Sequence, residues 1–311
     1  MVQDVGIQSC EPSRYSASWF RNDQEGLHFY TGLQSYYKFL FVLSSLGPAA
    51  GSLNYYHKVV PQLSIEDQFF LTLIKLRRNK PNFELSRMFG ISQATVTNIF
   101  VTWINFMFFQ WEETQWWPSR SLVSFYTPTD FKTKFPTTRV IVDGTECPIQ
   151  KPKQPVAQQA TFSTYKNRNT VKVLVGTTPG GLVSYVSQAY GGSVSDRQIC
   201  ERSTLPSLCD PGDSIMADKG FNVQDLFEQS LVTVNIPTFI KKKNRMSHET
   251  VMKDRKIASK RVHVERIIGL AKTYKLLKSP MNNTESALSS QIIKVCFYLC
   301  NFRSNIVPKN A

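Results

Sequence analysis

The order of strand-like and helix-like segments after residue 136 constrains the fold of this chain most strongly. Short runs rich in β-branched residues lie at 139–142, 171–175, 182–186, 214–217 and 231–236, and such runs predict strands. Helical segments are expected at 223–230, 257–277 and 287–302. These segments approximate the order strand, strand, strand, helix, strand, helix, strand, helix. We expect an α/β domain with helices on both faces of a mixed five-stranded sheet.

This order of elements is similar to that of the ribonuclease H-like fold, which we assign to residues 136–311. An all-α region with a linker is expected before it, at 63–135, and a partly helical N-terminal segment at 1–62. Tryptophan, proline and serine are frequent at 116–129, and this composition indicates the linker.

The stretch LSRMFGISQATVTNIF (85–100) has the pattern of a helix-turn-helix. One helix ends at Gly90, and Ser92 can cap the next. The second helix would present Gln93, Thr95, Thr97 and Asn98 to a DNA groove. A purely structural three-helix bundle is the alternative, because the apolar residues 106–109 must be buried.

The charge balance narrows the classes of partner. The chain has 37 Lys and Arg against 23 Asp and Glu, a net charge of +14, which favours a polyanion, DNA before an anionic membrane. The apolar stretches at 39–46 and 101–111 are shorter than the roughly 20 residues of a membrane span, and residues 1–11 lack a signal-peptide pattern. The six cysteines form no C-x-x-C pair, so neither a zinc knuckle nor a disulfide framework is indicated. We expect a soluble, unexported protein of the nucleus with no membrane partner.

Four acidic residues occupy strand ends or a helix face. Asp143 ends the first strand, Asp196 follows the third, Asp218 ends the fourth, and Glu265 lies on the late helix. A single such Asp is more often a solvated turn residue, but four in this order indicate a site for hard divalent cations. A phosphatase nucleophile at Asp143 is disfavoured, because Thr145 occupies the usual position of its general acid.

Most of the excess positive charge surrounds Glu265. Residues 241–278 contain 13 Lys and Arg against three acidic residues. On a helix, Arg261 and Lys272 would lie within about 40° of Glu265. We expect DNA phosphates to be contacted by Lys241, Lys242, Lys243, Arg261, Arg266 and Lys272. The alternatives are a nuclear-import signal at 241–245 and a solvated helix with an ordinary Glu–Arg pair.

Four motifs together resemble the DDE superfamily of transposases and endonucleases, in its Harbinger-like branch. They are VDGTE (142–146), GGSVSDRQ (191–198), MADKGF (216–221) and RVHVERIIG (261–269). The resemblance covers roughly residues 27–305 and includes the helix-turn-helix. Some relatives carry an N-terminal zinc-dependent THAP domain, and no such domain is visible in this sequence.

The resemblance implies that Asp143, Asp218 and Glu265 form a catalytic, metal-binding triad, with Asp196 as a fourth ligand or a close supporting residue. It implies Mg²⁺ or Mn²⁺ as the cofactor, and cleavage of DNA phosphodiester bonds by two ions about 3.5–4 Å apart. The chain would act as a homo-oligomer or with a separate DNA-binding partner. The alternative is a domesticated, catalytically silent DNA- or partner-binding protein. We expect His263 to have a structural or phosphate-contacting role.

Overall fold

The computed structural model describes residues 15–238, 248–304 and 307. The chain divides into two compact units, Met1–Phe106 and Met107–Ala311. In the described chain, no helix combines the length and apolarity needed to cross a membrane.

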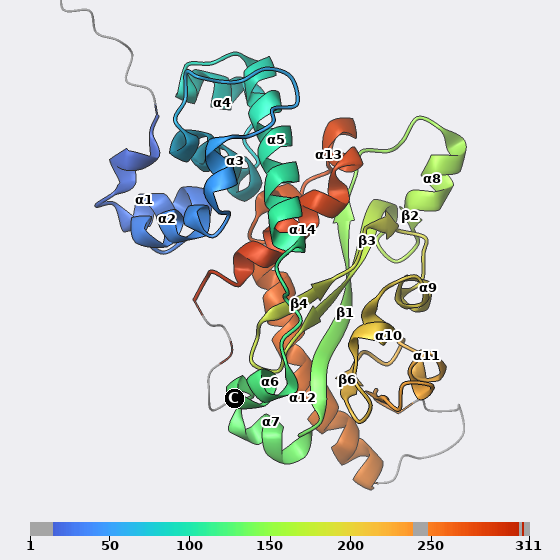
Figure 1. The fold of residues 1–311 in the computed structure, drawn as a ribbon. Coiled ribbons are helices and arrows are strands. Elements are labelled where there is room, and N and C mark those ends of the chain that lie inside the picture. The colour runs from blue at the N-terminus through green and yellow to red at the C-terminus, as the bar shows by residue number, and fades with distance from the viewer. Residues whose placement is uncertain (1–14, 239–247, 305–306, 308–311) are drawn as a thin grey trace, which may run out of the picture. The chain divides into compact units, whose positions relative to one another are not determined.

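The first unit is helical (Figure 1). Its elements are η1 (Ala17–Phe20), α1 (Gln24–Thr31), α2 (Tyr36–Ser44), η2 (Pro48–Gly51), α3 (Ile65–Arg78), α4 (Asn82–Phe89) and the first part of α5 (Gln93–Glu112). Local signals set several of these ends: the Ser92 side chain accepts a hydrogen bond from the Thr95 N–H at 3.0 Å, and Gly90 ends α4 at a φ of 63°, a value that glycine adopts without strain. The predicted helix, tight glycine turn and helix are confirmed.

The second unit is built on a mixed sheet. Its strands are β1 (Thr138–Pro148), β2 (Phe162–Ser163), β3 (Arg168–Thr177), β4 (Val183–Val186), β5 (Tyr190–Gly191), β6 (Ser214–Met216) and β7 (Thr233–Asn235). The main order is β2-β3-β1-β6-β7, with β4 and β5 also paired to β3. β1 is antiparallel to β3 and parallel to β6. The five strands predicted from the sequence are present, and the two-residue strands β2 and β5 are additional.

Helices cover both faces of this sheet, as the ribonuclease H-like order predicts (Figure 1). The remaining helices are α6 (Arg120–Tyr126), α7 (Thr129–Lys134), α8 (Pro155–Thr161), α9 (Asp196–Glu201), α10 (Leu205–Leu208), α11 (Gln224–Glu228), α12 (His248–Ala271), η3 (Lys275–Leu277), α13 (Asn283–Ala287) and α14 (Ser289–Cys300). On one face, Val142 packs with Ile199 of α9 and Phe227 of α11. On the other, Ile141 packs with Val264 of α12.

Two local predictions differ from the structure. The late helix was expected at 257–277, but α12 begins at His248 and ends at Ala271. Tyr274, beyond its end, has an extended backbone and a buried ring. The expected linker at 116–129 contains α6, and α7 begins at its end, where Phe131 is fully buried against Ile141.

Candidate active site

Three of the predicted site residues surround one guanidinium group. Nη1 of Arg261 lies 2.7 Å from Oδ1 of Asp218. Nη2 of the same side chain lies 3.8 Å from Oδ1 of Asp143 and 3.9 Å from Oε1 of Glu265. Carboxylates from three elements that are far apart in the sequence therefore converge on a single cation.

The register of the sheet explains why the two aspartates meet. β1 and β6 run parallel, with Ile141 beside Met216. Asp143 and Asp218 each follow this pair by two residues, and side chains two apart in an extended chain point to the same face. That face is covered by α12, because Ile141 and Met216 pack with Val264, the residue before Glu265.

Neighbouring backbone N–H groups hold both aspartates. The Gly144 N–H donates to Oδ1 of Asp143 at 2.9 Å, and the Lys219 N–H donates to Oδ1 of Asp218 at 2.7 Å. The Asp218 and Glu265 side chains are 57% and 54% exposed, whereas the Arg261 side chain is only 10% exposed. The acidic groups thus open toward solvent around a cation that is mostly buried.

Asp143 is the most strongly perturbed of these carboxyl groups. Its pKa is raised from the ordinary 3.8 to about 6, chiefly by burial, with smaller upward contributions from the negative charges of Asp218 and Asp196. Arg261 and the Gly144 N–H act in the opposite direction. Because Arg261 and the Gly144 N–H only partly offset the effect of burial, a further positive charge beside Asp143 would stabilise its ionised form.

This arrangement differs from a preformed metal cage. In the described chain, no three acidic, His or Cys side chains are grouped closely enough to hold a metal ion. The Arg261 guanidinium lies among the three carboxylates instead. Arg261 was predicted from the sequence to contact DNA, and its role as the shared partner of these acids was not foreseen.

Asp196 lies on the other side of β1. Its carboxylate is 3.0 Å from Nζ of Lys172, and a Cβ added to Gly144 would lie 2.3 Å from its Oδ1. Adjacent residues of a strand face opposite sides, so Asp196 is on the Gly144 side, whereas Asp143 faces Arg261. Asp196 still influences the pKa of Asp143, and its role as a metal ligand stays a prediction.

Four residues of α5 were expected to face DNA, and they have different environments. Gln93 is exposed, Thr95 is half-buried, and Thr97 accepts a hydrogen bond from the Asn82 amide at 2.8 Å. Asn98 was expected to be presented to DNA, but it is a buried residue that is only 4% exposed. Its amide accepts from the His57 N–H and donates to the Lys58 carbonyl, so a loop distant in the sequence covers this face of the helix.

The predicted basic contacts are only partly described. Lys241, Lys242 and Lys243 lie outside the described residues. Arg266 is exposed and Lys272 is half-buried. DNA contacts by these residues stay predictions.

His263 has a structural environment. Its ring is buried, and Nδ1 lies 3.0 Å from the Pro179 carbonyl oxygen. Burial lowers the pKa of His263. These contacts favour a structural role for His263 over a phosphate-contacting role.

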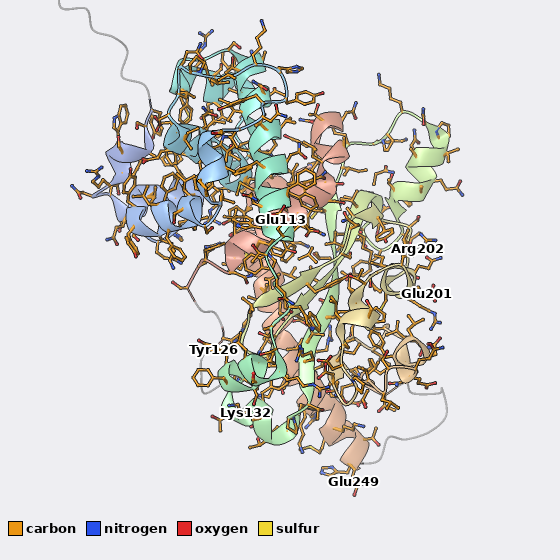
Figure 2. The ribbon with its side chains drawn as sticks, in the orientation of Figure 1. Glu113, Tyr126, Lys132, Glu201, Arg202 and Glu249 are labelled. Carbon is orange, nitrogen blue, oxygen red and sulfur yellow. The ribbon has the colours of Figure 1, made fainter. Side chains whose placement is uncertain are left out.

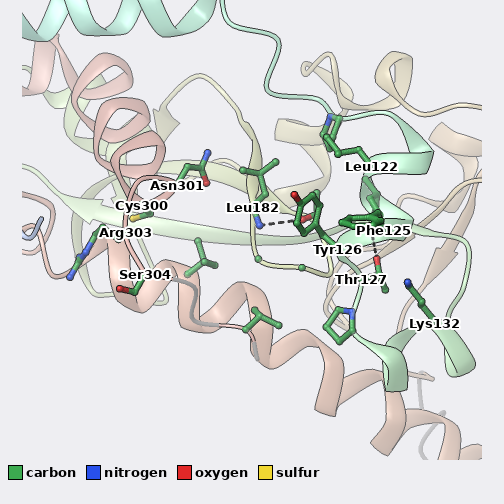
Figure 3. Close-up of a pocket in the computed structure, with 18 of the residues that line it drawn as sticks. Leu122, Phe125, Tyr126, Thr127, Lys132, Leu182, Cys300, Asn301, Arg303 and Ser304 are labelled. Atoms are coloured by element: carbon green, nitrogen blue, oxygen red, sulfur yellow. Dashed lines mark hydrogen bonds between the residues drawn. The ribbon is translucent and has the colours of Figure 1, made fainter. Parts of the chain in front are cut away.

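An apolar pocket of about 620 Å³ also lies in the second unit. Figure 3 shows Phe125 and Tyr126 on one side of it and Cys300 and Asn301 on the other. None of the predicted site residues lines this pocket, so its shape does not bear on the acidic site.

Comparison with known families agrees with this geometry. Residues 142–301, just over half of the chain, match the family described as DDE superfamily endonuclease. Residues 61–112 match the helix-turn-helix of DDE superfamily endonuclease. No curated protein matches the chain. The chain, with Asp143, Asp218 and Glu265 inside the matched range, therefore belongs to the DDE superfamily of endonucleases.

Proposed function

We propose that this protein is a metal-dependent DNA endonuclease of the transposase type, with Asp143, Asp218 and Glu265 as its catalytic residues. The convergence of these three carboxylates on Arg261 carries the proposal. The two family matches support nuclease action and DNA binding. Hydrolysis of a phosphodiester bond is the proposed reaction, with transfer to a DNA 3′-hydroxyl as its extension.

The donor set fits divalent metal ions. Carboxylate oxygens are the hard ligands that Mg²⁺ and Mn²⁺ prefer, and burial raises the pKa of Asp143 by more than Arg261 lowers it. Asp143, Asp218 and Glu265 would hold the ions, with Asp196 as a fourth ligand or a support. Two bound ions supply activation of water or of a DNA 3′-hydroxyl and stabilisation of the leaving oxygen.

The chain's own groups have separate tasks in this proposal. The Gly144 N–H fixes the Asp143 carboxylate, while the exposed carboxylates of Asp218 and Glu265 can adjust to the ions. Arg261 would leave its contact with Asp218 and pair with the phosphate, for which a guanidinium is well suited. No covalent protein intermediate is required.

A catalytically silent DNA- or partner-binding protein is the second candidate. The pairing of Arg261 with Asp218 favours it, because the carboxylates already have a cationic partner without metal. In this alternative the acidic residues serve fold stability alone. The protein would then bind DNA or a separate subunit without cleaving DNA.

A nicking assay tests the two candidates. Purified protein is incubated with supercoiled plasmid in Mg²⁺ or Mn²⁺, beside Asp143→Asn and Glu265→Gln. Glu249→Gln is the matched control, because Glu249 lies in the first turn of the same helix (Figure 2), roughly 24 Å along the helix axis from Glu265. We expect nicking by the wild type and the control only. Nicking by all four proteins would indicate contamination, and retained DNA binding without nicking would favour the silent alternative.

The setting of this activity is also part of the proposal. A nuclear location follows from DNA as the substrate, with the basic segment 241–245 as the import signal. A fluorescent fusion carrying Lys241→Gln, Lys242→Gln and Lys243→Gln should lose nuclear accumulation. Sedimentation with and without DNA would separate a homo-oligomer from a chain that depends on a different partner.

A further inference from the structure

Four basic side chains line a small pocket in the second unit, here called the cationic pocket. It has a volume of about 250 Å³ and includes Lys166, Arg168, Lys272, Lys278, Glu146 and Thr170. Four positive charges thus share a small space with one carboxylate. Of these four, only Lys272 was predicted from the sequence to contact DNA.

The fold brings these cations together from distant segments. Lys166 lies in the turn between β2 and β3, and Arg168 is the first residue of β3. Lys272 directly follows α12, where its N–H donates to the Ile268 carbonyl at 2.9 Å. Lys278 follows η3 as its capping residue. The pocket therefore exists only in the folded chain.

The cations of the pocket lack acidic partners. Within the part of the chain that the structure describes, ion pairs engage other basic residues, and none includes Lys166, Arg168, Lys272 or Lys278. Lys166 instead lies 4.5 Å from the centre of the Tyr165 ring. The carboxylate of Glu146 accepts a hydrogen bond from the Thr170 hydroxyl at 2.8 Å.

Lys272 lies in surroundings that disfavour its positive charge. Burial lowers its pKa, and the positive charge of Lys166 lowers it further. Asp143 acts in the opposite direction on the same ammonium group, so the pocket lies within electrostatic reach of the catalytic carboxylate. A bound anion would offset the repulsion among the four cations.

We propose that the cationic pocket binds a phosphodiester group of the DNA backbone, next to the bond that is cleaved at the acidic site. Its volume suits one phosphate group, and Arg168 and the lysines supply the N–H donors that phosphate oxygens accept. The inference rests on the proposed function for the identity of the polymer. The pocket would fix the position of the strand relative to Asp143, so that the carboxylates act on a neighbouring phosphate.

The salt dependence of DNA affinity tests this site without requiring catalysis. The affinity of the full chain for a labelled duplex is measured without divalent metal over a series of salt concentrations. Each lost phosphate contact should reduce the slope of log K against log salt by about 0.9. We expect a reduction for Lys272→Gln and for Arg168→Gln, and a total reduction of about 0.9 in the double variant, because both side chains would contact the same phosphate.

Lys275→Gln is the matched control, since Lys275 is an exposed lysine three residues from both Lys272 and Lys278 and lies outside the pocket. It should leave the slope unchanged. Equal slopes for the wild type and the pocket variants, with the variants folded by circular dichroism, would overturn the inference. Equal reductions in the control and in the pocket variants would also overturn it, because they would indicate nonspecific charge.

Chemical acetylation followed by mass spectrometry distinguishes DNA from a free anion. Duplex DNA should protect Lys272 and Lys278, whereas inorganic phosphate at the same phosphate concentration should not. Protection by inorganic phosphate alone would overturn the assignment to DNA. The plasmid assay is independent of this test. A changed slope without nicking would support the phosphate-binding pocket and refute the nuclease function. Nicking with unchanged slopes would support the nuclease function and refute the pocket.

Discussion

Replacing Asp143 with Asn should stabilise the folded chain near neutral pH and have little effect in acid. Burial raises the pKa of Asp143 to about 6, from 3.8 in an exposed carboxyl group. The folded chain therefore holds a proton that the unfolded chain releases at lower pH. The contribution of this proton to the free energy of unfolding is fully present below about pH 4 and is lost as the pH rises through about 6. Asn imitates the protonated acid and avoids this loss.

The magnitude follows from the two pKa values. The interval between 3.8 and about 6, at about 1.4 kcal/mol per pH unit, corresponds to a difference of about 3 kcal/mol in the free energy of unfolding between the variant and the wild type near pH 7. At about pH 4 the same calculation leaves less than about 1 kcal/mol. The Asp143 side chain is only 25% exposed, so solvent screening removes a small part of this difference.

Urea denaturation of the wild type and Asp143→Asn over this pH range measures the effect. The free energy of unfolding of the variant should exceed that of the wild type by an amount that grows with pH. Asp225→Asn is a control of opposite sign, because the Arg197 hydrogen bond lowers the pKa of Asp225, and this substitution should destabilise near pH 7. A stability difference between Asp143→Asn and the wild type that does not vary with pH would refute the reasoning.

Three further predictions concern the metal, the helix-turn-helix and the first strand. Mg²⁺ or Mn²⁺ should raise the melting temperature of the wild type and have little effect on Asp143→Asn; equal shifts in calorimetry would place the ions elsewhere. Asn98→Ala should destabilise the chain by about 1–3 kcal/mol, because it leaves the polar backbone groups at residues 57 and 58 without their amide partner. At temperatures below unfolding, the DNA affinity of this variant should equal that of the wild type. A lower affinity would indicate that Asn98 contacts DNA. Gly144→Ala should displace the Asp196 carboxylate, since the new Cβ would lie 2.3 Å from its Oδ1; isothermal titration should then show weaker Mg²⁺ binding if Asp196 supports the site, and unchanged binding would exclude that support.

The sequence alone was sufficient for the features that depend on neighbouring residues. Ser92 and Gly90 mark helix ends because capping and a positive φ act within one turn. The β-branched runs predicted β1, β3, β4, β6 and β7 in their order along the chain, since burial in a sheet selects such residues. Asp218 follows β6 as expected, but the prediction that Asp143 ends the first strand is wrong, because β1 continues past it to Pro148.

Only the tertiary structure decided the partners of the site residues. β1 continues to Pro148 because residues 143–148 pair with β3, although the β-branched run ends at Val142. Asn98 is covered by a loop about 40 residues earlier in the chain. Helical spacing placed Arg261 beside Glu265, but the contact with Asp218 requires α12 to pack on the face shared by β1 and β6. Contacts between distant segments depend on packing and register, which a local pattern does not contain, and these contacts decide which charges are balanced.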